Sequence, residues 1–265
     1  MPRFDEYCNK YSCVKMERRQ GILQMTLHTN GGPLQWGLKP QGELVQAFTD
    51  IAADRENRLI IFTGTGNEFS GPRADASVDV YHEGGARHTP WDLDSVHWNA
   101  ERLMTRMLDI EVPMIGVVNG PAKRHADLAL MCDIVIAADD ASFEDTAHFH
   151  NGGIVPGDGI NVVYTMLMGL NRARYLMLTG QVMSAKEAKE VGMVSELMPR
   201  EKLLPRAWEL AGQLAKKPDL LLRYTRIVLT HPLKLRMQEG IKYFLAMETL
   251  AKLDHTHQGQ AGSHT

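Results

Sequence analysis

The sequence lacks the features that mark several special classes of protein. No apolar run approaches the length of about 18 residues that a membrane-spanning helix needs, so no transmembrane segment is predicted. Residues 1–10 carry both charge signs and no apolar block, which argues against a secretory signal peptide. The three cysteines are irregularly spaced, which favours free thiols in a reducing cytoplasm over a disulfide framework.

An excess of one charge sign is also missing. The chain has 29 Lys and Arg against 32 Asp and Glu, a net charge of −3, and its basic residues are scattered. Nucleic-acid binding is therefore disfavoured. No glycine directly precedes a lysine, and the Gly-x-Gly-x-x-Gly, Gly-x-Ser-x-Gly and His-Glu-x-x-His motifs are absent. We therefore do not expect nucleotide, nicotinamide or serine-nucleophile chemistry.

The sequence does contain an average globular composition and an alternating pattern of strands and helices. Its 265 residues, 44% of them hydrophobic, suffice for one large domain or two small ones. A predicted hairpin and a helix opened by Pro40 precede alternating strands and helices over Leu59–Thr63, Trp91–Ile110, Pro113–Val118, Ala126–Met131 and Ile134–Ala138. This pattern predicts an α/β fold. Gly64–Thr89 has no sustained period and is expected to be a functional or mobile loop.

Beyond Gly157 the pattern becomes almost wholly helical. Ser184 and Glu187 form a predicted capping box, followed by a short strand over Met193–Leu197. Further helices are predicted over Leu203–Ala215, Asp219–Leu229 and Leu233–Leu253. We therefore expect a core over residues 1–200, a helical region over 201–253 and a disordered tail over 254–265.

The most unusual local chemistry lies in residues 147–159. His148 and His150 are followed, across a glycine-rich turn, by Asp158, which stands between two glycines at a predicted helix start. An aspartate there accepts hydrogen bonds from first-turn N–H groups and also from an imidazole. Three interpretations stay open: a helix cap beside an ordinary loop histidine, a catalytic histidine–aspartate pair, and a metal site that uses both histidines.

Three further positions are candidates for contact with a ligand. His125 is either a donor at a predicted helix start, where backbone N–H groups bind anions, or a solvated loop residue. Glu248 lies on the apolar stripe of a predicted helix, where its carboxylate is either paired or at the edge. Trp36 either packs or offers its indole N–H to a ligand carbonyl.

Several motifs follow one another along most of the chain. They are Arg58 to Gly66 followed by Phe69, PMIGVVNGP from Pro113, ALMCDIVIAADDASF from Ala129, IVPGDG from Ile154 and LTGQVMSAKEAKEVGMVSELM from Leu178. In this order they resemble the crotonase (enoyl-CoA hydratase/isomerase) superfamily, and the resemblance covers roughly residues 12–250. It implies a crotonase-like ββα spiral with a C-terminal helical trimerisation region, in trimers that commonly pair into hexamers.

The sequence departs from the hydratases of this superfamily where their chemistry is carried. The sequences of those enzymes look like Asn-Gly-x-Ala-x-Gly-Gly-Gly in this loop, with a glutamate soon after. They carry a second catalytic glutamate before the Pro-Gly turn. Here Lys123-Arg124-His125 replaces the glycines, Asp127 stands for the first glutamate, and Ala147 and His148 occupy the neighbourhood of the second. The Ala-Gly-Ala-Asp loop is also altered, over residues 71–75. These departures argue against two-glutamate hydration and against CoA binding.

The sequence looks like one branch of the superfamily at those same positions, the β-diketone hydrolases, of which 6-oxocamphor hydrolase is the type. That branch carries His-Phe followed by Gly-Ile-Val-Pro-Gly-Asp-Gly, a histidine in the Asn-Gly-Pro loop and an early tryptophan. Two differences bear on substrate range. The loop after the His-Phe pair is one residue longer here, and Gln41 replaces a histidine expected five residues after the tryptophan.

Carried over by motif, the branch's functional residues are His148, Asp158, His125 and Trp36, and Glu248 matches a carboxylate near the end of its C-terminal helix. The resemblance implies that His148 is the base that activates water, oriented and made more basic by Asp158. Glu248 would support a histidine or the water. The His125 side chain and the Trp36 N–H would help to hold the developing oxygen charge.

Two more residues complete the expected site. Backbone N–H groups around Arg124 would assist the oxyanion, and Arg124 and Phe149 would contact the substrate. The implied enzyme is a retro-Claisen hydrolase of (cyclic) β-diketones that uses neither cofactor nor metal and forms a homotrimer or a dimer of trimers. The alternatives are an acyl-CoA hydratase, isomerase or hydrolase with an altered site, and a scaffold that only oligomerises.

Overall fold

A computed structural model of the chain describes residues 2–71 and 89–261. Its centre is a six-stranded sheet in the order β1-β2-β3-β4-β5-β8, in which only the β1–β2 hairpin is antiparallel. The strands are Val14–Arg19, Ile22–Leu27, Leu59–Thr63, Met114–Val118, Ile134–Ala138 and Glu196–Met198. β3 and β4 are buried on both faces, as their continuous apolar sequences predict.

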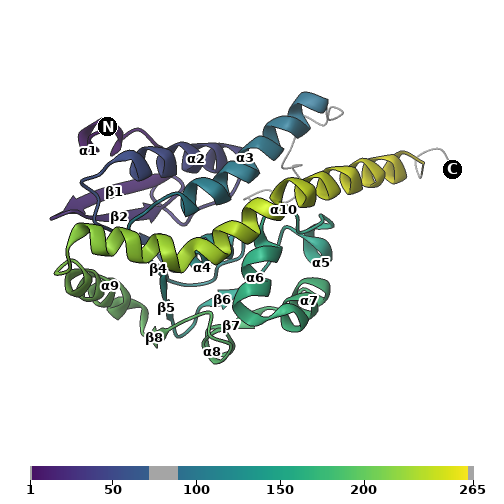
Figure 1. The fold of residues 1–265 in the computed structure, drawn as a ribbon. Coiled ribbons are helices and arrows are strands. Elements are labelled where there is room, and N and C mark those ends of the chain that lie inside the picture. The colour runs from purple at the N-terminus through teal and green to yellow at the C-terminus, as the bar shows by residue number, and fades with distance from the viewer. Residues whose placement is uncertain (1, 72–88, 262–265) are drawn as a thin grey trace.

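Helices cover this sheet and complete the core (Figure 1). α2 and α3 lie side by side over one part of the sheet, and α10 crosses the molecule beside α3. The helices are α1 (Phe4–Tyr7), α2 (Leu38–Ala53), α3 (Pro90–Leu108), α4 (Ala126–Leu130), α5 (Phe149–Gly152), α6 (Ile160–Met168), α7 (Leu170–Thr179), α8 (Ala185–Glu190), α9 (Arg200–Leu214) and α10 (Asp219–Ala261). The α/β class expected from the sequence is confirmed.

A second, shorter ladder runs beside the main sheet. Isolated parallel bridges join Gln35 to Gly71, Ser70 to Ala122 and Ala122 to Phe143. The ladder continues into an antiparallel pair, β6 (Ser142–Phe143) with β7 (Met183–Ser184). Successive strand–loop units thus contribute in turn to the main sheet and to this ladder.

Asn119 fixes the loops that leave β3 and β4. Its Oδ1 accepts a hydrogen bond from the Gly64 N–H at 3.1 Å, and its Nδ2 donates to the Gly66 and Glu68 carbonyls at 2.9 and 3.1 Å. Gly120 must be glycine, because a Cβ there would lie 1.9 Å from the Asn67 carbonyl oxygen. The Asn-Gly pair therefore sets the path of the chain towards residues 121–125.

The C-terminal region differs from the expected pair of helices. α10 is one continuous helix that contains Pro232, and Figure 1 shows that it changes direction along its length. A proline removes one backbone hydrogen bond and usually kinks or ends a helix. Contacts on both sides of Pro232 fix the helix against the rest of the chain: Arg226 Nε donates to Asp133 at 2.8 Å, and Lys234 Nζ donates to Asp109 at 2.5 Å.

Other boundaries also move. The last strand of the main sheet is Glu196–Met198 rather than Met193–Leu197, because Met193 and Val194 are buried outside the ladder. α10 runs to Ala261, into the stretch where a disordered tail is expected. The Gly64–Thr89 loop and the altered 71–75 motif lie mostly outside the described residues.

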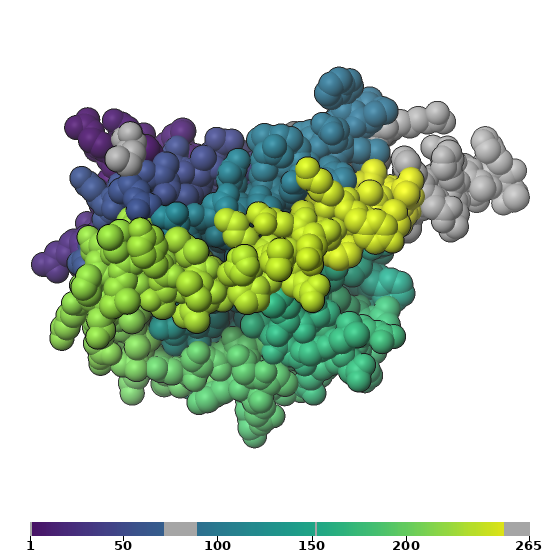
Figure 2. Space-filling view, viewed as in Figure 1, coloured from purple at the N-terminus to yellow at the C-terminus, as the bar shows by residue number. Residues whose placement is uncertain are grey.

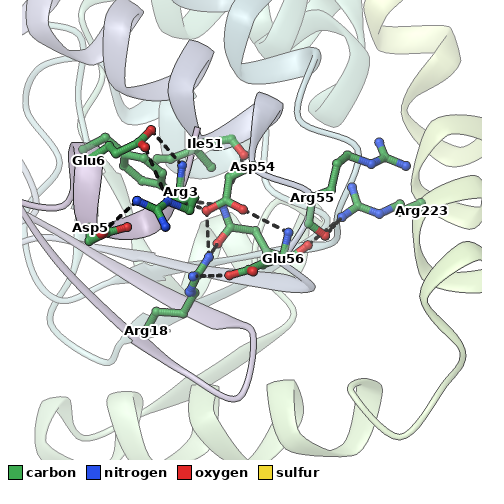
Figure 3. A network of polar contacts seen from close by, with 11 residues as sticks. Arg3, Asp5, Glu6, Arg18, Ile51, Asp54, Arg55, Glu56 and Arg223 are labelled. Atoms are coloured by element: carbon green, nitrogen blue, oxygen red, sulfur yellow. Dashed lines mark hydrogen bonds and ion pairs between the residues drawn. The ribbon is translucent and has the colours of Figure 1, made fainter. Parts of the chain in front are cut away.

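A polar network around Asp54 ties the first strand to the end of α2 (Figure 3). The buried Asp54 carboxylate accepts from Arg18 at 2.7 Å and from the Tyr7 hydroxyl at 2.8 Å, and its other oxygen accepts from the Glu56 N–H. Arg18 also binds the Glu56 carboxylate at 2.7 Å. Loss of one partner from a buried ion pair typically lowers the free energy of unfolding by about 3–5 kcal/mol, so this network stabilises the fold.

Candidate active site

A small polar cavity lies at the edge of the sheet where the parallel strands end. It is formed by the segments that follow β2, β4 and β5, together with α3 and α10. Ligand sites of α/β proteins commonly occupy this edge. We call it the histidine cavity; its lining includes Trp36, Gln41, Arg124, His125, Ala147, His148, Asp158 and Glu248. Its free volume of about 30 Å³ accommodates a water molecule.

Six of the seven residues predicted for the site meet in this cavity. The exception is Phe149, which is 55% exposed and does not line it. Phe149 begins α5, where the chain turns away directly after His148. Gln41, which replaces the expected histidine, is buried in the cavity wall. A larger hollow of about 670 Å³ lies between α6, α7 and α10, but no histidine lines it.

The His148 ring is held from both sides by carboxylates. Nδ1 lies 2.9 and 3.0 Å from the two oxygens of Asp145, and Nε2 lies 3.4 Å from Asp158 Oδ2. Asp145 also accepts from the backbone N–H groups of Ala147 and His148. Burial alone would lower the pKa of His148, but the charges of Asp158 and Asp145 outweigh it and raise that pKa well above 6.5.

Asp145 was missed by the sequence reasoning. It is the residue that orients the His148 ring, whereas Asp158 faces the opposite nitrogen. The Asp-x-x-His spacing carries a weak signal, because an aspartate in a turn commonly accepts from backbone N–H groups two or three residues later. Nothing in the sequence shows that its oxygens also reach the imidazole.

Asp158 is shared between a helix start and two imidazoles. Its Oδ1 accepts from the N–H of Ile160 at 3.3 Å, while Oδ2 lies 3.4 Å from His148 Nε2 and 3.8 Å from His125 Nε2. The N-cap of α6 is Gly159, so Asp158 precedes the cap position; it contacts the first helical N–H and also faces both imidazoles. Burial raises the pKa of Asp158, but the nearby His148 and His125 outweigh it and hold that pKa well below its usual range.

His125 is the second imidazole of the cavity. Its backbone is left-handed, with φ 49° and ψ 46°, which is uncommon for a residue other than glycine. The Trp36 ring stacks against it at a centroid distance of 4.0 Å, so Trp36 packs as well as lining the cavity. On the far side, His125 Nδ1 lies 3.5 Å from Asp127, which is fully buried.

Glu248 enters the cavity from α10, so its place on the apolar stripe is explained by tertiary contact. A Cβ at Gly157 would lie 2.4 Å from the Phe244 carbonyl oxygen and 3.0 Å from Glu248 Cβ, so glycine allows the Asp158 loop to touch α10. Burial, reinforced by Asp158, raises the pKa of Glu248 to about 8. Burial lowers the pKa of Arg124, and the negative charges of Asp158 and Asp145 partly offset this shift.

The structure separates the two histidines of the metal interpretation. His148 is buried in the cavity, whereas His150 is exposed on α5 beside Gly180. Within the described part of the chain, no three His, Cys, Asp or Glu side chains are grouped to hold a metal ion. Among the helices described, none is both long and apolar enough to cross a membrane.

The raised pKa of Glu248 predicts how stability depends on pH. The folded chain binds this proton more tightly than the unfolded chain, so wild-type stability falls as pH rises from 4.5 through about 8. Glu248→Gln lacks this contribution, and its unfolding free energy relative to wild type should increase across that window in urea titrations. Glu239→Gln, at an exposed position of the same helix, is the control. Parallel curves for wild type and Glu248→Gln would contradict the burial effect.

Comparison with known proteins places this geometry in a family. The family model for enoyl-CoA hydratase/isomerase matches residues 17–263. A probable peroxisomal enoyl-CoA hydratase of Arabidopsis thaliana is 30% identical over 77% of this chain and 76% of its own. A putative enoyl-CoA hydratase of Thermus thermophilus is 32% identical, over 75% of this chain and 76% of its own.

Solved structures show the same fold. An enoyl-CoA hydratase from Mycobacterium avium subsp. paratuberculosis superimposes with a TM-score of 0.75 at 19% identity, over 91% of this chain and 89% of its own. A β-diketone hydrolase from the cyanobacterium Anabaena, bound to (S)-3-oxocyclohexyl acetic acid, superimposes with a TM-score of 0.89 at 39% identity, covering 97% of this chain and 99% of its own. The chain therefore belongs to the enoyl-CoA hydratase/isomerase family, the crotonase superfamily.

Proposed function

We propose that this chain is a hydrolase that cleaves a carbon–carbon bond of cyclic β-diketones by a retro-Claisen reaction, without a cofactor. The observation that carries the proposal is the row Asp145–His148–Asp158–His125, in which the last three residues line the histidine cavity and Asp145 holds His148 from behind. It supplies a base, a counter-charge and a hydrogen-bond donor within a few ångströms. The similarity to a β-diketone hydrolase at 39% identity over 97% of the chain supports it.

In the first step, His148 removes a proton from water. Asp145 holds the Nδ1–H, so the lone pair of a neutral imidazole lies on Nε2, on the cavity side. Nε2 takes the proton, and the hydroxide oxygen bonds to one carbonyl carbon of the diketone. Asp158, 3.4 Å away, stabilises the imidazolium that forms.

The tetrahedral intermediate then carries a negative oxygen. The His125 side chain and the cation of Arg124 line the same cavity and are placed to stabilise it, with backbone N–H groups around Arg124 assisting. Collapse of the intermediate breaks the bond between the carbonyl carbon and the carbon between the two ketones. The electron pair of that bond enters the second carbonyl as an enolate, and the first becomes a carboxylic acid.

The enolate carbon must finally gain a proton. The His148 imidazolium can return the one taken from water, which closes the proton balance with Asp145 and Asp158 unchanged. Glu248, with its pKa near 8, is protonated at neutral pH and supports the water or the imidazole through that proton. The product acid ionises on release, and Arg124 provides the counter-charge while it remains bound.

The ligand of the Anabaena hydrolase indicates the substrate class. It is a keto acid with an acetic acid arm on a ring ketone. The ketone has two neighbouring ring carbons, and one of them lies opposite the carbon that carries the acetic acid arm. A bond between that carbon and the carboxyl carbon gives a bicyclic β-diketone. We therefore propose cyclic and bicyclic β-diketones as substrates. Because the histidine cavity has a free volume of about 30 Å³, side chains around it must move to admit a ring.

The second candidate activity is that of an acyl-CoA hydratase, isomerase or hydrolase. It is favoured by the curated relatives, which are mostly named enoyl-CoA hydratases. Against it, Ala147 lines the cavity in the neighbourhood of the second catalytic glutamate. Asp127, in place of the first, is fully buried and is not part of the cavity lining.

Exposed apolar side chains on α10 support a proposal about assembly. Six of them gather on its first part: Leu220, Leu221, Tyr224, Ile227, Val228 and Leu229. α10 crosses the surface in Figure 2. Contiguous apolar surface of this kind marks protein interfaces. We propose that it packs against other copies in a homotrimer or a dimer of trimers. Light scattering should give three or six times the chain mass of 29.7 kDa, and a monomer would contradict this.

The proposed function predicts selective turnover of diketones. Purified protein should convert a bicyclic or monocyclic β-diketone to the keto acid, and activity should survive dialysis against EDTA. Because the base must be unprotonated and the pKa of His148 is raised, kcat/KM should increase with pH above 6.5. Crotonyl-CoA serves as the competing substrate. Hydration of crotonyl-CoA without diketone cleavage would favour the second candidate.

Variants separate the roles of the two carboxylates. His148→Ala should lower kcat by on the order of a hundredfold to ten-thousandfold. Asp145→Asn should also lower kcat, because the ring turns or takes the wrong tautomer. It should cost little more in the His148→Ala background, because the contact of Asp145 with the site runs through the His148 imidazole. Asp158 also faces His125, so Asp158→Asn should lower kcat further in the His148→Ala background.

Melting temperatures of the same variants control for folding. If the Asp145→Asn and His148→Ala losses add in log kcat, Asp145 does not act through His148. Asp158→Asn should also move the rise of kcat/KM to lower pH, because it removes a charge that raises the pKa of His148. An Asp158→Asn variant with wild-type rate and pH profile would reduce Asp158 to a helix cap.

A further inference from the structure

Asp127 is a buried carboxyl group that the steps above do not use. It lies in α4, two residues after His125, and its side chain is fully buried. Neither oxygen has a hydrogen-bond partner among the described residues, and His125 Nδ1 lies 3.5 Å from Oδ1. A buried carboxylate without donors is costly to ionise, and burial accordingly raises the pKa of Asp127.

The position of the His125 ring is fixed independently of Asp127. The left-handed backbone at φ 49° directs the side chain, and the Trp36 ring covers one of its faces. Strained backbone of this kind persists where the surrounding structure enforces it, often at functional sites. Packing does not decide which ring nitrogen carries the proton. That choice depends on the groups facing Nδ1 and Nε2.

We propose that Asp127 remains a neutral carboxylic acid and donates its proton to Nδ1 of His125, which fixes the tautomer with Nε2–H directed at the histidine cavity. An ionised Asp127 would instead accept from Nδ1–H and leave a neutral His125 without a proton on Nε2. Asp127 is thus a positioning residue that acts through His125. The inference rests on the proposed function, in which that N–H stabilises the oxyanion.

The groups around the pair favour this arrangement. Nε2 of His125 lies 3.8 Å from the ionised Asp158, which attracts an N–H and repels a lone pair. The same negative charge opposes ionisation of Asp127. Arg124 and, from α6, the buried Tyr164 hydroxyl are the other titratable groups that interact with Asp127. Arg124 lies in the cavity wall and adds a positive charge there.

Nitrogen-15 NMR of the histidine-labelled protein tests the tautomer directly. The His125 signals are assigned by their loss in His125→Gln. Over a pH series, the neutral form of the ring should carry its proton on Nε2 and leave Nδ1 unprotonated. A neutral ring with its proton on Nδ1 would overturn the proposal. Because Glu248 is also protonated at neutral pH, infrared spectra should show carboxylic acid absorption from both groups, and Asp127→Asn should remove the part that Glu248→Gln leaves.

Two substitutions of Asp127 separate hydrogen bonding from packing. Asp127→Asn keeps a donor for Nδ1 and should retain the tautomer and a kcat within a few-fold of wild type. Asp127→Leu has no donor; the tautomers should mix, and kcat should fall by roughly tenfold or more with little change in KM. Leu128→Ala, a buried neighbour in α4, should lower the melting temperature without changing the His125 spectrum. An unchanged spectrum in Asp127→Leu would overturn the proposal.

The outcomes separate this inference from the proposed function. The NMR result does not require a substrate, so the Nε2–H tautomer can be observed even if no diketone is cleaved; the function then fails and the inference about Asp127 stands. If a diketone is cleaved but His125 has the other tautomer, the proposed function stands and the inference about Asp127 fails. If Asp127→Leu does not fold, the wild-type spectrum and the Asp127→Asn comparison still decide the question.

Discussion

The site depends on one buried negative charge, that of Asp158, placed between two imidazoles. Without that charge, burial would lower the pKa of His148 and weaken it as a base. Without the imidazoles, burial would favour the protonated form of Asp158. Each group therefore maintains the charge state of the other. The negative charges of Asp145 and Asp158 are balanced by the His148 imidazolium and by Arg124, which allows these four polar side chains to lie close together in a buried environment.

The fold brings these groups together from distant parts of the chain. Parallel strands end at one edge of the sheet, so the segments after β4 and β5 deliver His125 and His148 to the same place. Asn119 fixes the first segment by bonding to the loop after β3. α10 closes the cavity with Glu248 because Gly157 permits close contact. A superfamily scaffold thus holds a site without the paired glutamates of hydratases.

Burial separates the carboxyl groups of the site into two classes. Asp145 and Asp158 contact an imidazole and stay ionised, because a neighbouring cation offsets the cost of desolvation. For Asp127 and Glu248 desolvation prevails, and their pKa values rise. Asp145 and Asp158 also accept hydrogen bonds from backbone N–H groups, which Asp127 does not. The donors and charges that face each carboxyl group therefore decide its protonation state.

The sequence by itself determined the α/β class, most strands and helices, and six of the residues that line the cavity. The class and the elements follow from periodicity and from glycine and asparagine at turns, and the six residues from motifs that resemble those of the superfamily. Only the tertiary structure decided which nitrogen of His148 faces which aspartate, that α10 continues through Pro232, and that Phe149 lies outside the cavity. These depend on contacts between residues far apart in sequence, or on the direction of a side chain, and neither leaves a periodic signal.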